Sequence, residues 1–436
     1  MTSAKKIIIL LGDILILYGA LILTLIFRYG PNYFGESFYA HLKPFSLIFI
    51  IWIVIFYLAD LYKEKWLRIS PATIQAFILA IIISVVSSVI LFYLFPSFFK
   101  MTPKTNLAIF TLIFGVLDIG WRIILVKIYI SGGLKDRLLI IGDSPIIDEV
   151  IDYFKNNPQI GYDVTAQKSE NDISQIIAKN KINTIIIQTH LKKDQKIIKI
   201  FYQLLPSKIA IVDLITFYET IFQKLPLEEL NESWFIDKIT TRRHLYDIAK
   251  RTIDFCLALF LSIIFLPFMI IIAVLVKLTS KGLIIYRQKR VGLNNKSFSL
   301  FKFRTMRTDA EKFGAQWASK NDLRITPIGR FLRLTHLDEL PQLYNIFKGD
   351  LSFVGPRPER PEFVEKLKEQ IPYYEIRHII KPGLTGWAQI NYRYGASLED
   401  AYEKSEYDIF YLKNRSLILD LLIILKTIKA IFATPK

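Results

Sequence analysis

The stretch FCLALFLSIIFLPFMIIIAVLV, residues 255–276, contains 22 uncharged residues and is long enough to cross the apolar core of a bilayer. Pro267 interrupts it near the middle, where proline removes a helical hydrogen bond and bends the axis. Beyond it, residues 277–335 carry 14 Lys and Arg against three Asp and Glu, which a crossing helix would export against the positive-inside rule. We therefore predict a re-entrant membrane hairpin over residues 250–277, broken at Pro267; an ordinary Pro-kinked span is the alternative.

Four earlier apolar segments are also long enough for transmembrane helices. They are Ile7–Phe27, Pro44–Tyr62, Ser70–Phe99 and Thr105–Ile130. The last contains Asp118 and Arg122, which at i and i+4 can pair on one helix face. The first segment is too long for a signal peptide and is expected to be an anchor. Residues 1–131 are thus predicted to form a membrane α-helical bundle of four spans.

The distribution of Lys and Arg orients this bundle. The second loop and the segment after the fourth span are richer in positive charge than the first and third loops. The residues concerned are Lys63, Lys65, Arg68, Lys127, Lys135 and Arg137 on the richer side, and Arg28, Lys43, Lys100 and Lys104 on the poorer side. The positive-inside rule therefore places both ends of the bundle in the cytoplasm.

After the bundle, short β-rich runs alternate with helical segments, which predicts a small parallel α/β, Rossmann-like domain over residues 136–240. Strands are expected at 137–142, 162–166, 182–188 and 209–213. The first turn contains Gly142, but Ser144 and Ile147 stand where a dinucleotide loop has its second and third glycines. This departure favours a structural or regulatory module over a cofactor-binding one.

Composition limits the class of protein and of partner. Hydrophobic residues make up 52% of the chain, which excludes disorder and makes lipid burial necessary. The 56 Lys and Arg against 39 Asp and Glu give a net charge of +17, so anionic partners are expected. The single cysteine, Cys256, excludes disulfides.

Two polar blocks in the last third of the chain carry the candidate chemistry. Residues 286–306 place Arg290, Lys302 and Arg304 among aromatic residues. Interleaved Arg and Phe could also form a nucleic-acid patch, but a domain held at a membrane favours a small phosphate-rich substrate, and no nucleic acid is expected. A solvated basic strand pair with no binding role is the other alternative for this block.

The second block, residues 333–360, contains the adjacent carboxylates Asp338 and Glu339. The structural alternative is a capping arrangement in which Thr335 caps a helix with Asp338 at its third position. Nearby Arg333 and the rigid Pro-flanked Arg357 favour phosphate chemistry instead, because arginine forks suit phosphate oxygens.

Two further segments follow. Trp387 lies in a turn-rich stretch and is expected to be an interfacial anchor rather than a substrate contact. Residues 417–431 form an apolar helix expected to lie on the membrane or to pack on the re-entrant hairpin.

The ordered motifs of this region resemble those of the bacterial sugar transferases, the polyprenyl-phosphate hexose-1-phosphate transferases. The matching stretches are YRQKRVG (286–292), FKFRTM (301–306), LDELPQLYNIFKGD (337–350), SFVGPRP (352–358) and KPGLTGWAQIN (381–391). They cover residue 245 to the C-terminus, and the preceding spans resemble the long, polytopic subfamily that starts exopolysaccharide or O-antigen repeat units. Leu266 and His336 depart from the serines common in the family at these positions.

The resemblance implies a phosphoglycosyl transferase domain over residues 241–436, a re-entrant-helix α/β domain at the membrane interface. Asp338 would attack a UDP-sugar, with UDP-glucose or UDP-galactose expected, and undecaprenyl phosphate would then take the phosphosugar. Mg²⁺ held by Asp338 and Glu339 is implied, and Glu339 is either a metal ligand or a base. Two unit negative charges 4 Å apart repel by about 4 kcal/mol at an effective dielectric of 20, or about a thousandfold in rate, so the step needs cations.

Arg290, Lys302, Arg304, Arg333 and Arg357 are the expected substrate-binding residues, and the bacterial inner membrane is the expected location, with the catalytic domain facing the cytoplasm. Two alternatives stay open: a membrane-tethered nucleotide-sugar epimerase or oxidoreductase that uses the α/β domain, and a non-catalytic scaffold for polysaccharide assembly. The identity of the hexose and the oligomeric state, including a homodimer, are not readable from the sequence.

Overall fold

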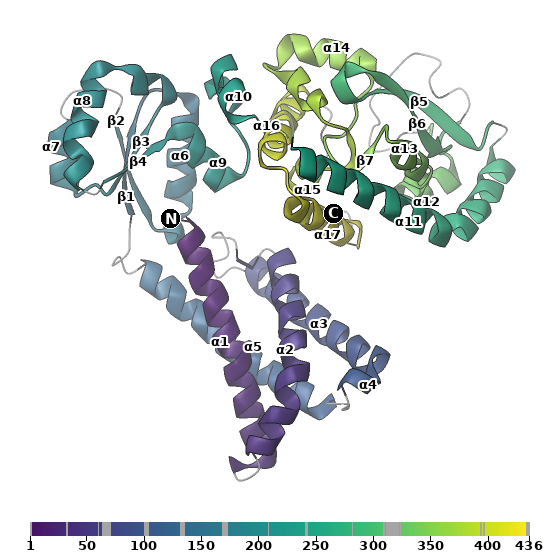
Figure 1. Cartoon of the computed structure of the whole chain (residues 1–436), viewed down its shortest axis with the longest axis horizontal. Helices are drawn as coiled ribbons and strands as arrows, with labels where there is room; N and C mark the ends of the chain where they lie inside the picture. Colours follow the sequence, from purple (N-terminus) through teal and green to yellow (C-terminus); the bar gives the residue numbers. More distant parts are fainter. Residues whose placement is uncertain are drawn as a thin grey trace. The chain divides into compact units, whose positions relative to one another are not determined.

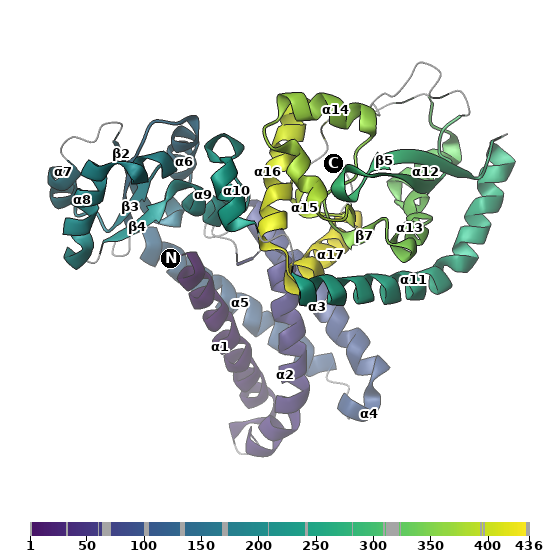
Figure 2. The ribbon, with the colours of Figure 1, turned by 45° about the horizontal axis from the view of Figure 1, so that its top comes forward.

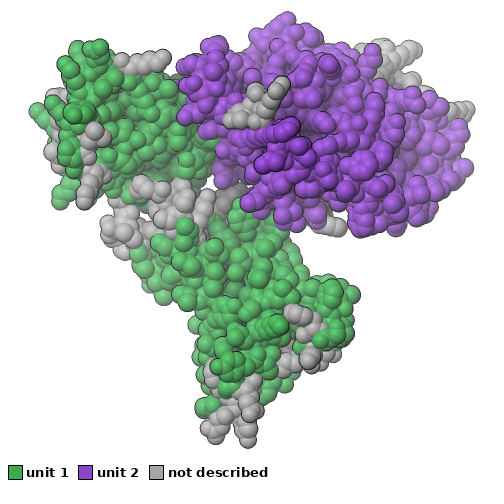
Figure 3. All heavy atoms as spheres, in the orientation of Figure 1, with its two compact units in different colours: residues 1–221 green, residues 222–436 purple. Residues whose placement is uncertain are grey.

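The computed structural model describes residues 2–31, 34–59, 61–62, 71–99, 104–130, 136–167, 173–207, 209–239, 243–280, 282–307, 310, 322, 324–392, 395 and 397–432. The chain divides into two compact units, residues 1–221 and residues 222–436 (Figure 3). Among the positive charges used above to orient the bundle, Lys63, Lys65, Arg68, Lys100 and Lys135 lie outside the described residues.

The first unit begins with long apolar helices (Figure 1). They are α1 (Thr2–Tyr29), α2 (Phe34–Leu58), α3 (Pro71–Leu94) and α5 (Lys104–Ile130), with a short α4 (Pro96–Phe99). The four predicted segments are therefore helical, although Pro96 begins a new helix where we expected the third segment to continue. Five described helices, these four and α11 (His244–Thr279), are long and apolar enough to cross a membrane.

A buried charge cluster links two of these helices. Arg122 Nε donates to Asp118 Oδ2 at 2.7 Å, which confirms the predicted pair. Arg122 Nη2 also donates to Asp13 Oδ2 of α1 at 3.0 Å, and both carboxylates are fully buried. One guanidinium thus holds two helices together in an apolar interior.

The α/β region of the first unit is a parallel sheet of four strands in the order β2-β1-β3-β4. The strands are β1 (Asp136–Ile141), β2 (Tyr162–Gln167), β3 (Thr184–Ile187) and β4 (Ala210–Asp213), and the helices are α6 (Pro145–Asn156), α7 (Ile173–Asn180), α8 (Gln195–Leu204) and α9 (Leu214–Phe222). The four predicted strands and their parallel arrangement are confirmed. Ser144 caps α6 by accepting a hydrogen bond from the Ile146 amide.

The turn after β1 is filled by a side chain. Gln188 Oε1 accepts a hydrogen bond from the Asp143 amide at 3.2 Å. A Cβ added at Gly142, whose φ is +145°, would lie 2.6 Å from that same oxygen. The crevice between β1 and β3, where open parallel sheets bind phosphates, therefore contains an amide of the protein itself.

The second unit surrounds two small sheets. Strand β5 (Ile285–Val291) pairs antiparallel with β6 (Ser297–Phe303), and β7 (Ser352–Val354) pairs parallel with β8 (Gly383–Thr385). The helices are α10 (Glu232–Lys238), α11, α12 (Pro327–Leu334), α13 (Gln342–Lys348), α14 (Pro361–Gln370), α15 (Trp387–Asn391), α16 (Leu398–Asn414) and α17 (Leu417–Phe432).

Helix α11 is a single helix that passes through Pro267 and changes direction along its course (Figure 2). In its first half Ala258 packs with Ile346 and Leu351, and in its second half Ile272 and Val276 pack with residues of β6 and α12. The hairpin expected from the sequence is thus one bent helix, because a single proline removes only one hydrogen bond of the ladder.

The packing of Trp387 and of helix α17 bears on two expectations for the C-terminal part of the chain. Trp387 is buried, stacks on Phe410, and donates its indole hydrogen to the carbonyl oxygen of Gln223 at 2.9 Å. It is therefore a core residue, and the expectation of an interfacial anchor was wrong. Helix α17 packs on α11, as one of the two expectations had it, since Lys250 Nζ lies 2.7 Å from Asp420 Oδ2.

Residues 222–239 belong to the second unit, whereas the sequence placed them in the α/β domain. Lys224 Nζ lies 3.0 Å from Glu403 Oε1 and 2.8 Å from Glu406 Oε2, both on α16. The boundary predicted at residue 240 therefore differs from the division between the units, at residue 221.

Candidate functional site

The turn that carries the two carboxylates is held rigidly between α12 and α13. Thr326 caps α12 by accepting from the Gly329 amide at 3.0 Å. A Cβ at Gly329 would clash with the carbonyl of Thr305, so only glycine allows α12 to approach the end of β6 this closely. His336 then adopts a left-handed conformation (φ +55°) and leads into the turn Leu337–Glu339.

Thr335 does not cap this turn. Its hydroxyl donates back to the carbonyl oxygen of Phe331 at 2.9 Å, at the C-terminus of α12. The capping alternative for Asp338 is therefore wrong, and its carboxylate is left for another role.

Glu339 is bound by two cations. Lys302 Nζ, from β6, lies 2.6 Å from Glu339 Oε1, and Arg357 Nη2 donates to the same oxygen at 3.2 Å. Although burial opposes ionisation, these two cations hold the pKa of Glu339 far below its usual range. Glu339 is thus a fixed carboxylate anion, and a carboxylate with so low a pKa is a poor general base.

Asp338 has the opposite environment. The residue is 7% exposed, and among the described residues its carboxylate makes no hydrogen bond. Burial raises the pKa of Asp338 above its usual value, while Lys302 and Arg333 act to lower it. A carboxylate that is poorly solvated and without a direct partner retains its lone pairs for attack or for a metal.

The predicted cations Lys302, Arg333 and Arg357 interact with different carboxylates of the turn. Lys302 and Arg357 contact Glu339, while Arg333 lies in the electrostatic field of Asp338 and donates from Nε to Thr305 Oγ1 at 2.9 Å. Burial lowers the pKa of Arg333. Burial also lowers the pKa of Lys302, and the neighbouring carboxylates Glu339 and Asp338 offset only part of this effect.

Arg290 and Arg304 make no described hydrogen bond or ion pair with the two carboxylates, although Glu339 acts electrostatically on Arg290. Arg290 donates to Gln288 Oε1 at 2.7 Å and to the carbonyl oxygen of Pro358 at 3.0 Å, so it supports the segment that carries Arg357. Arg304 donates to the carbonyl oxygen of Leu283 at 2.7 Å, and no described contact joins it to Asp338 or Glu339. Both bind neighbouring parts of the chain in this structure, and their expected role in substrate binding stays a prediction.

Tyr374, Arg377 and Asp408 position Arg357, and no sequence motif predicted this role for them. Arg377 donates to the carbonyl oxygen of Arg357 at 3.0 Å and to the Tyr374 hydroxyl at 2.7 Å. Its Nη2 also lies 2.6 Å from Asp408 Oδ2. Burial raises the pKa of Asp408 to about 6, while Arg377 lowers it. Tyr374 and Arg377 share the turn Tyr374–Ile379, but Asp408 lies on α16 and Arg357 follows β7, so only the folded chain brings the three segments together.

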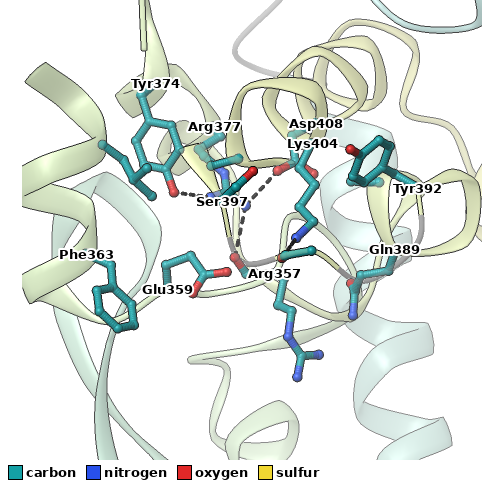
Figure 4. A pocket seen from close by; sticks show the side chains of 14 residues that line it. Arg357, Glu359, Phe363, Tyr374, Arg377, Gln389, Tyr392, Ser397, Lys404 and Asp408 are labelled. Carbon is teal, nitrogen blue, oxygen red and sulfur yellow. Dashed lines mark hydrogen bonds and ion pairs between the residues drawn. The ribbon is translucent and has the colours of Figure 1, made fainter. Parts of the chain in front are cut away.

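A cavity of about 210 Å³ lies beside Arg357 (Figure 4). Residues of α14, α15, α16 and the turn Tyr374–Ile379 line it. Figure 4 shows the Arg357 guanidinium pointing away from the Arg377–Asp408 pair. Arg357 is therefore shared between the cavity and the carboxylate turn.

Few side chains of the described residues could serve as metal ligands at this site. Among the described residues, no group of three or more His, Cys, Asp or Glu side chains could hold a metal ion. Mg²⁺, however, is commonly held by one or two carboxylates together with substrate phosphates. Asp338, which has no hydrogen-bonded partner in the described part of the chain, and the anionic Glu339 fit such a site.

The chain is similar to known proteins over its C-terminal part and, for some relatives, over more of its length. Residues 245–434 match the model of the bacterial sugar transferase family. A UDP-N-acetylgalactosamine-undecaprenyl-phosphate N-acetylgalactosaminephosphotransferase of Aeromonas hydrophila is 41% identical over 213 residues, 49% of this chain and 50% of that protein. UDP-glucose:undecaprenyl-phosphate glucose-1-phosphate transferases of Klebsiella pneumoniae and Escherichia coli are 33% and 31% identical, over 67% of both chains in each pair.

The match covers half of the Aeromonas protein and two thirds of the other two. In the latter pair it extends beyond the region that the family model matches. The chain therefore belongs to the bacterial sugar transferase family.

Proposed function

We propose that the chain transfers a hexose-1-phosphate from a UDP-sugar to undecaprenyl phosphate, releasing UMP, as the first step of exopolysaccharide, O-antigen or capsule repeat-unit synthesis. The observation that carries this proposal is the contrast between two adjacent carboxylates. Asp338 is buried with no hydrogen bond from a described residue, while Glu339 is fixed by Lys302 and Arg357.

The names of the relatives support UDP-glucose or UDP-N-acetylgalactosamine as the donor. UDP-galactose, also expected from the sequence, stays a prediction. A homodimer has no support here, and we propose none.

In the first step, an Oδ of Asp338 attacks the phosphorus that bears the sugar. A bond forms between that oxygen and phosphorus, the bond from phosphorus to the bridging oxygen breaks, and UMP leaves with the electron pair. Arg357, which contacts Glu339, and Arg333, which interacts electrostatically with Asp338, supply positive charge that offsets the repulsion between carboxylate and phosphate.

In the second step, an oxygen of undecaprenyl phosphate attacks the same phosphorus, and the Asp338 carboxylate leaves. The acceptor phosphate is an anion near neutral pH, so this step needs no strong base. The low pKa of Glu339 agrees with a holding role rather than with proton abstraction.

Asp338 and Glu339 would hold Mg²⁺ together with the donor diphosphate. When bound, Mg²⁺ would supply positive charge that stabilises the departing phosphate. Lys302 would keep Glu339 ionised and fixed in place for this role.

We further propose that α11 is re-entrant in the inner membrane and holds the site at the cytoplasmic face. Both halves of α11 pack against this one unit, through Ala258 and through Ile272 and Val276. The amide of Phe353 donates to Asp254 Oδ1 of α11 at 3.3 Å, which ties the helix to strand β7. This arrangement would let a membrane-held acceptor reach Asp338 from the lipid side.

The test is intact-mass analysis after the purified protein is mixed with UDP-glucose or UDP-N-acetylgalactosamine and Mg²⁺, without lipid acceptor. We expect wild-type protein to gain the mass of one sugar phosphate, hexose phosphate or N-acetylhexosamine phosphate according to the donor, and to release UMP. Asp338→Asn should show neither, and turnover with acceptor should fall at least about a thousandfold. Asp350→Asn, in the same motif but paired with exposed Lys348, is the matched control and should react normally.

Full turnover by Asp338→Asn would refute the covalent mechanism. Absence of UMP release by wild-type protein with any UDP-sugar would refute the proposed function.

A further inference from the structure

The cavity beside Arg357 has walls of mixed character. Phe363, Tyr374 and Tyr392 contribute aromatic rings, and Gln389 contributes an amide (Figure 4). Its floor is the hydrogen-bonded group of Tyr374, Arg377 and Asp408. Aromatic faces together with fixed polar groups are typical of sites that bind a nucleobase and a ribose.

The cavity also has positive charge in its lining, which suits an anionic ligand. Arg357 and Lys404 both line it. Lys404 Nζ donates to the carbonyl oxygen of Gly395 at 2.8 Å, and burial lowers the pKa of this lysine. Desolvated cations bind phosphate oxygens more strongly than exposed ones do.

The position of the cavity relative to the carboxylates decides which part of a donor it could hold. Neither Asp338 nor Glu339 lines it, and Arg357 connects it to Glu339 through the 3.2 Å hydrogen bond. In phosphoryl transfer the attacking and leaving oxygens lie roughly in line with phosphorus. With Asp338 on one side of the reacting phosphate, the leaving group lies on the other side, and Arg357 is the residue that contacts the carboxylate turn and also lines the cavity.

We infer that this cavity binds the nucleoside 5′-monophosphate part of the donor, the group that leaves, with the α-phosphate at Arg357 and the base against the aromatic wall. This inference rests on the proposed function and assigns a substrate subsite to it. The sugar, bonded to the attacked phosphorus and not in line with the leaving oxygen, lies outside the cavity.

Arg377 and Asp408 act in this subsite as positioning residues. Arg377 holds the carbonyl oxygen of Arg357 and is itself held by Asp408. The Arg357 guanidinium can thus contact Glu339 while its backbone is fixed from the cavity floor.

The test compares UMP binding, by calorimetry on the full chain in detergent, for wild type, Ala401→Trp and Leu398→Trp. Ala401 lines the cavity, whereas Leu398 is exposed on the same helix, outside the cavity, and serves as the matched control. We expect the Kd for UMP and the KM for the UDP-sugar to rise at least about fivefold in Ala401→Trp, the low end of one lost base stack. Leu398→Trp should match wild type.

Phe363→Ala provides a second variant if the tryptophan at 401 prevents folding, and the same rise in Kd is expected from it. Unchanged UMP affinity in a folded cavity variant would overturn the inference while leaving the proposed function intact. Conversely, wild-type protein that binds UMP in this cavity but releases none from UDP-sugars would refute the proposed function and leave the nucleotide subsite standing.

Discussion

At the scale of the residue, two carboxylates that are neighbours in sequence acquire different chemistry from their surroundings. Lys302 and Arg357 both contact Oε1 of Glu339, whereas Asp338 has only more distant cations and is 7% exposed. The pKa of Glu339 is therefore lowered and that of Asp338 is raised. Such separation of two carboxyl groups by environment is how one site assigns two roles.

The raised pKa of Asp338 predicts a pH dependence. Only the ionised carboxylate attacks phosphorus, so kcat/KM should fall as the pH drops through this pKa, at a higher pH than for an ordinary aspartate. Arg333 lowers the pKa of Asp338, so Arg333→Gln should move this acid limb to higher pH. The measurement is the pH profile of UMP release.

Arg330→Gln is the control for this profile, because Arg330 is exposed on the same helix α12. An acid limb that stays in place in Arg333→Gln would show that Asp338 does not control the profile.

At the scale of the element, α12 positions the carboxylate turn through one close backbone approach. Gly329 packs directly against the carbonyl of Thr305, and Arg333, one turn later, donates to the hydroxyl of the same residue. This contact fixes the position of the turn Leu337–Glu339. The site therefore depends on Gly329, which has no reactive side chain.

We expect Gly329→Ala to destabilise the protein by about 1–3 kcal/mol, because the methyl group has no room and α12 must shift. The shift should also lower kcat. Thermal unfolding and turnover of the purified variant check this. Gly120→Ala, where an added Cβ meets no atom within 4 Å, should leave both unchanged. Equal stability of the two variants would contradict the close contact at Thr305.

In the bundle, α1 and α5 are joined by the charge cluster of Asp13, Arg122 and Asp118. Arg122→Leu would leave two buried carboxylates without a cation, which typically costs about 3–5 kcal/mol. We expect a lower midpoint of thermal unfolding in detergent and a partial rescue when Asp13→Asn is added. If Arg122→Leu alone is as stable as wild type, the cluster does not hold these helices together. The same conclusion follows if adding Asp13→Asn lowers the stability of Arg122→Leu further.

At the scale of the whole molecule, unit 222–436 carries both carboxylates, their cations and the cavity, together with the long apolar helix α11. A re-entrant α11 requires that both of its ends face the cytoplasm. Leu245 and Leu283, before and after its apolar part, are 86% and 76% exposed and suit cysteine probes.

With Cys256, the one cysteine of the chain, replaced by serine, Leu245→Cys and Leu283→Cys should both react with a membrane-impermeant thiol reagent in inside-out vesicles. Neither should react in intact spheroplasts. Labelling of the two positions from opposite sides would establish a crossing helix and would refute the re-entrant arrangement.

Much of the architecture follows from local patterns. Apolar runs predicted the long N-terminal helices, buried β-rich runs predicted the four parallel strands, and motif spacing singled out Asp338 and Glu339. These features depend on neighbours within a few residues, through helix length, side-chain periodicity and the turn chemistry of Gly and Pro, so sequence alone determines them.

Contacts between distant segments were decided only by the tertiary structure. Lys302 binds Glu339 rather than Asp338, Asp13 joins Arg122 across 109 positions, and Arg377 with Asp408 holds Arg357. Trp387, expected at the membrane surface, is buried against Phe410. Burial and pairing of this kind depend on which faces meet when helices and strands pack, and the pKa difference between adjacent carboxylates arises from that packing.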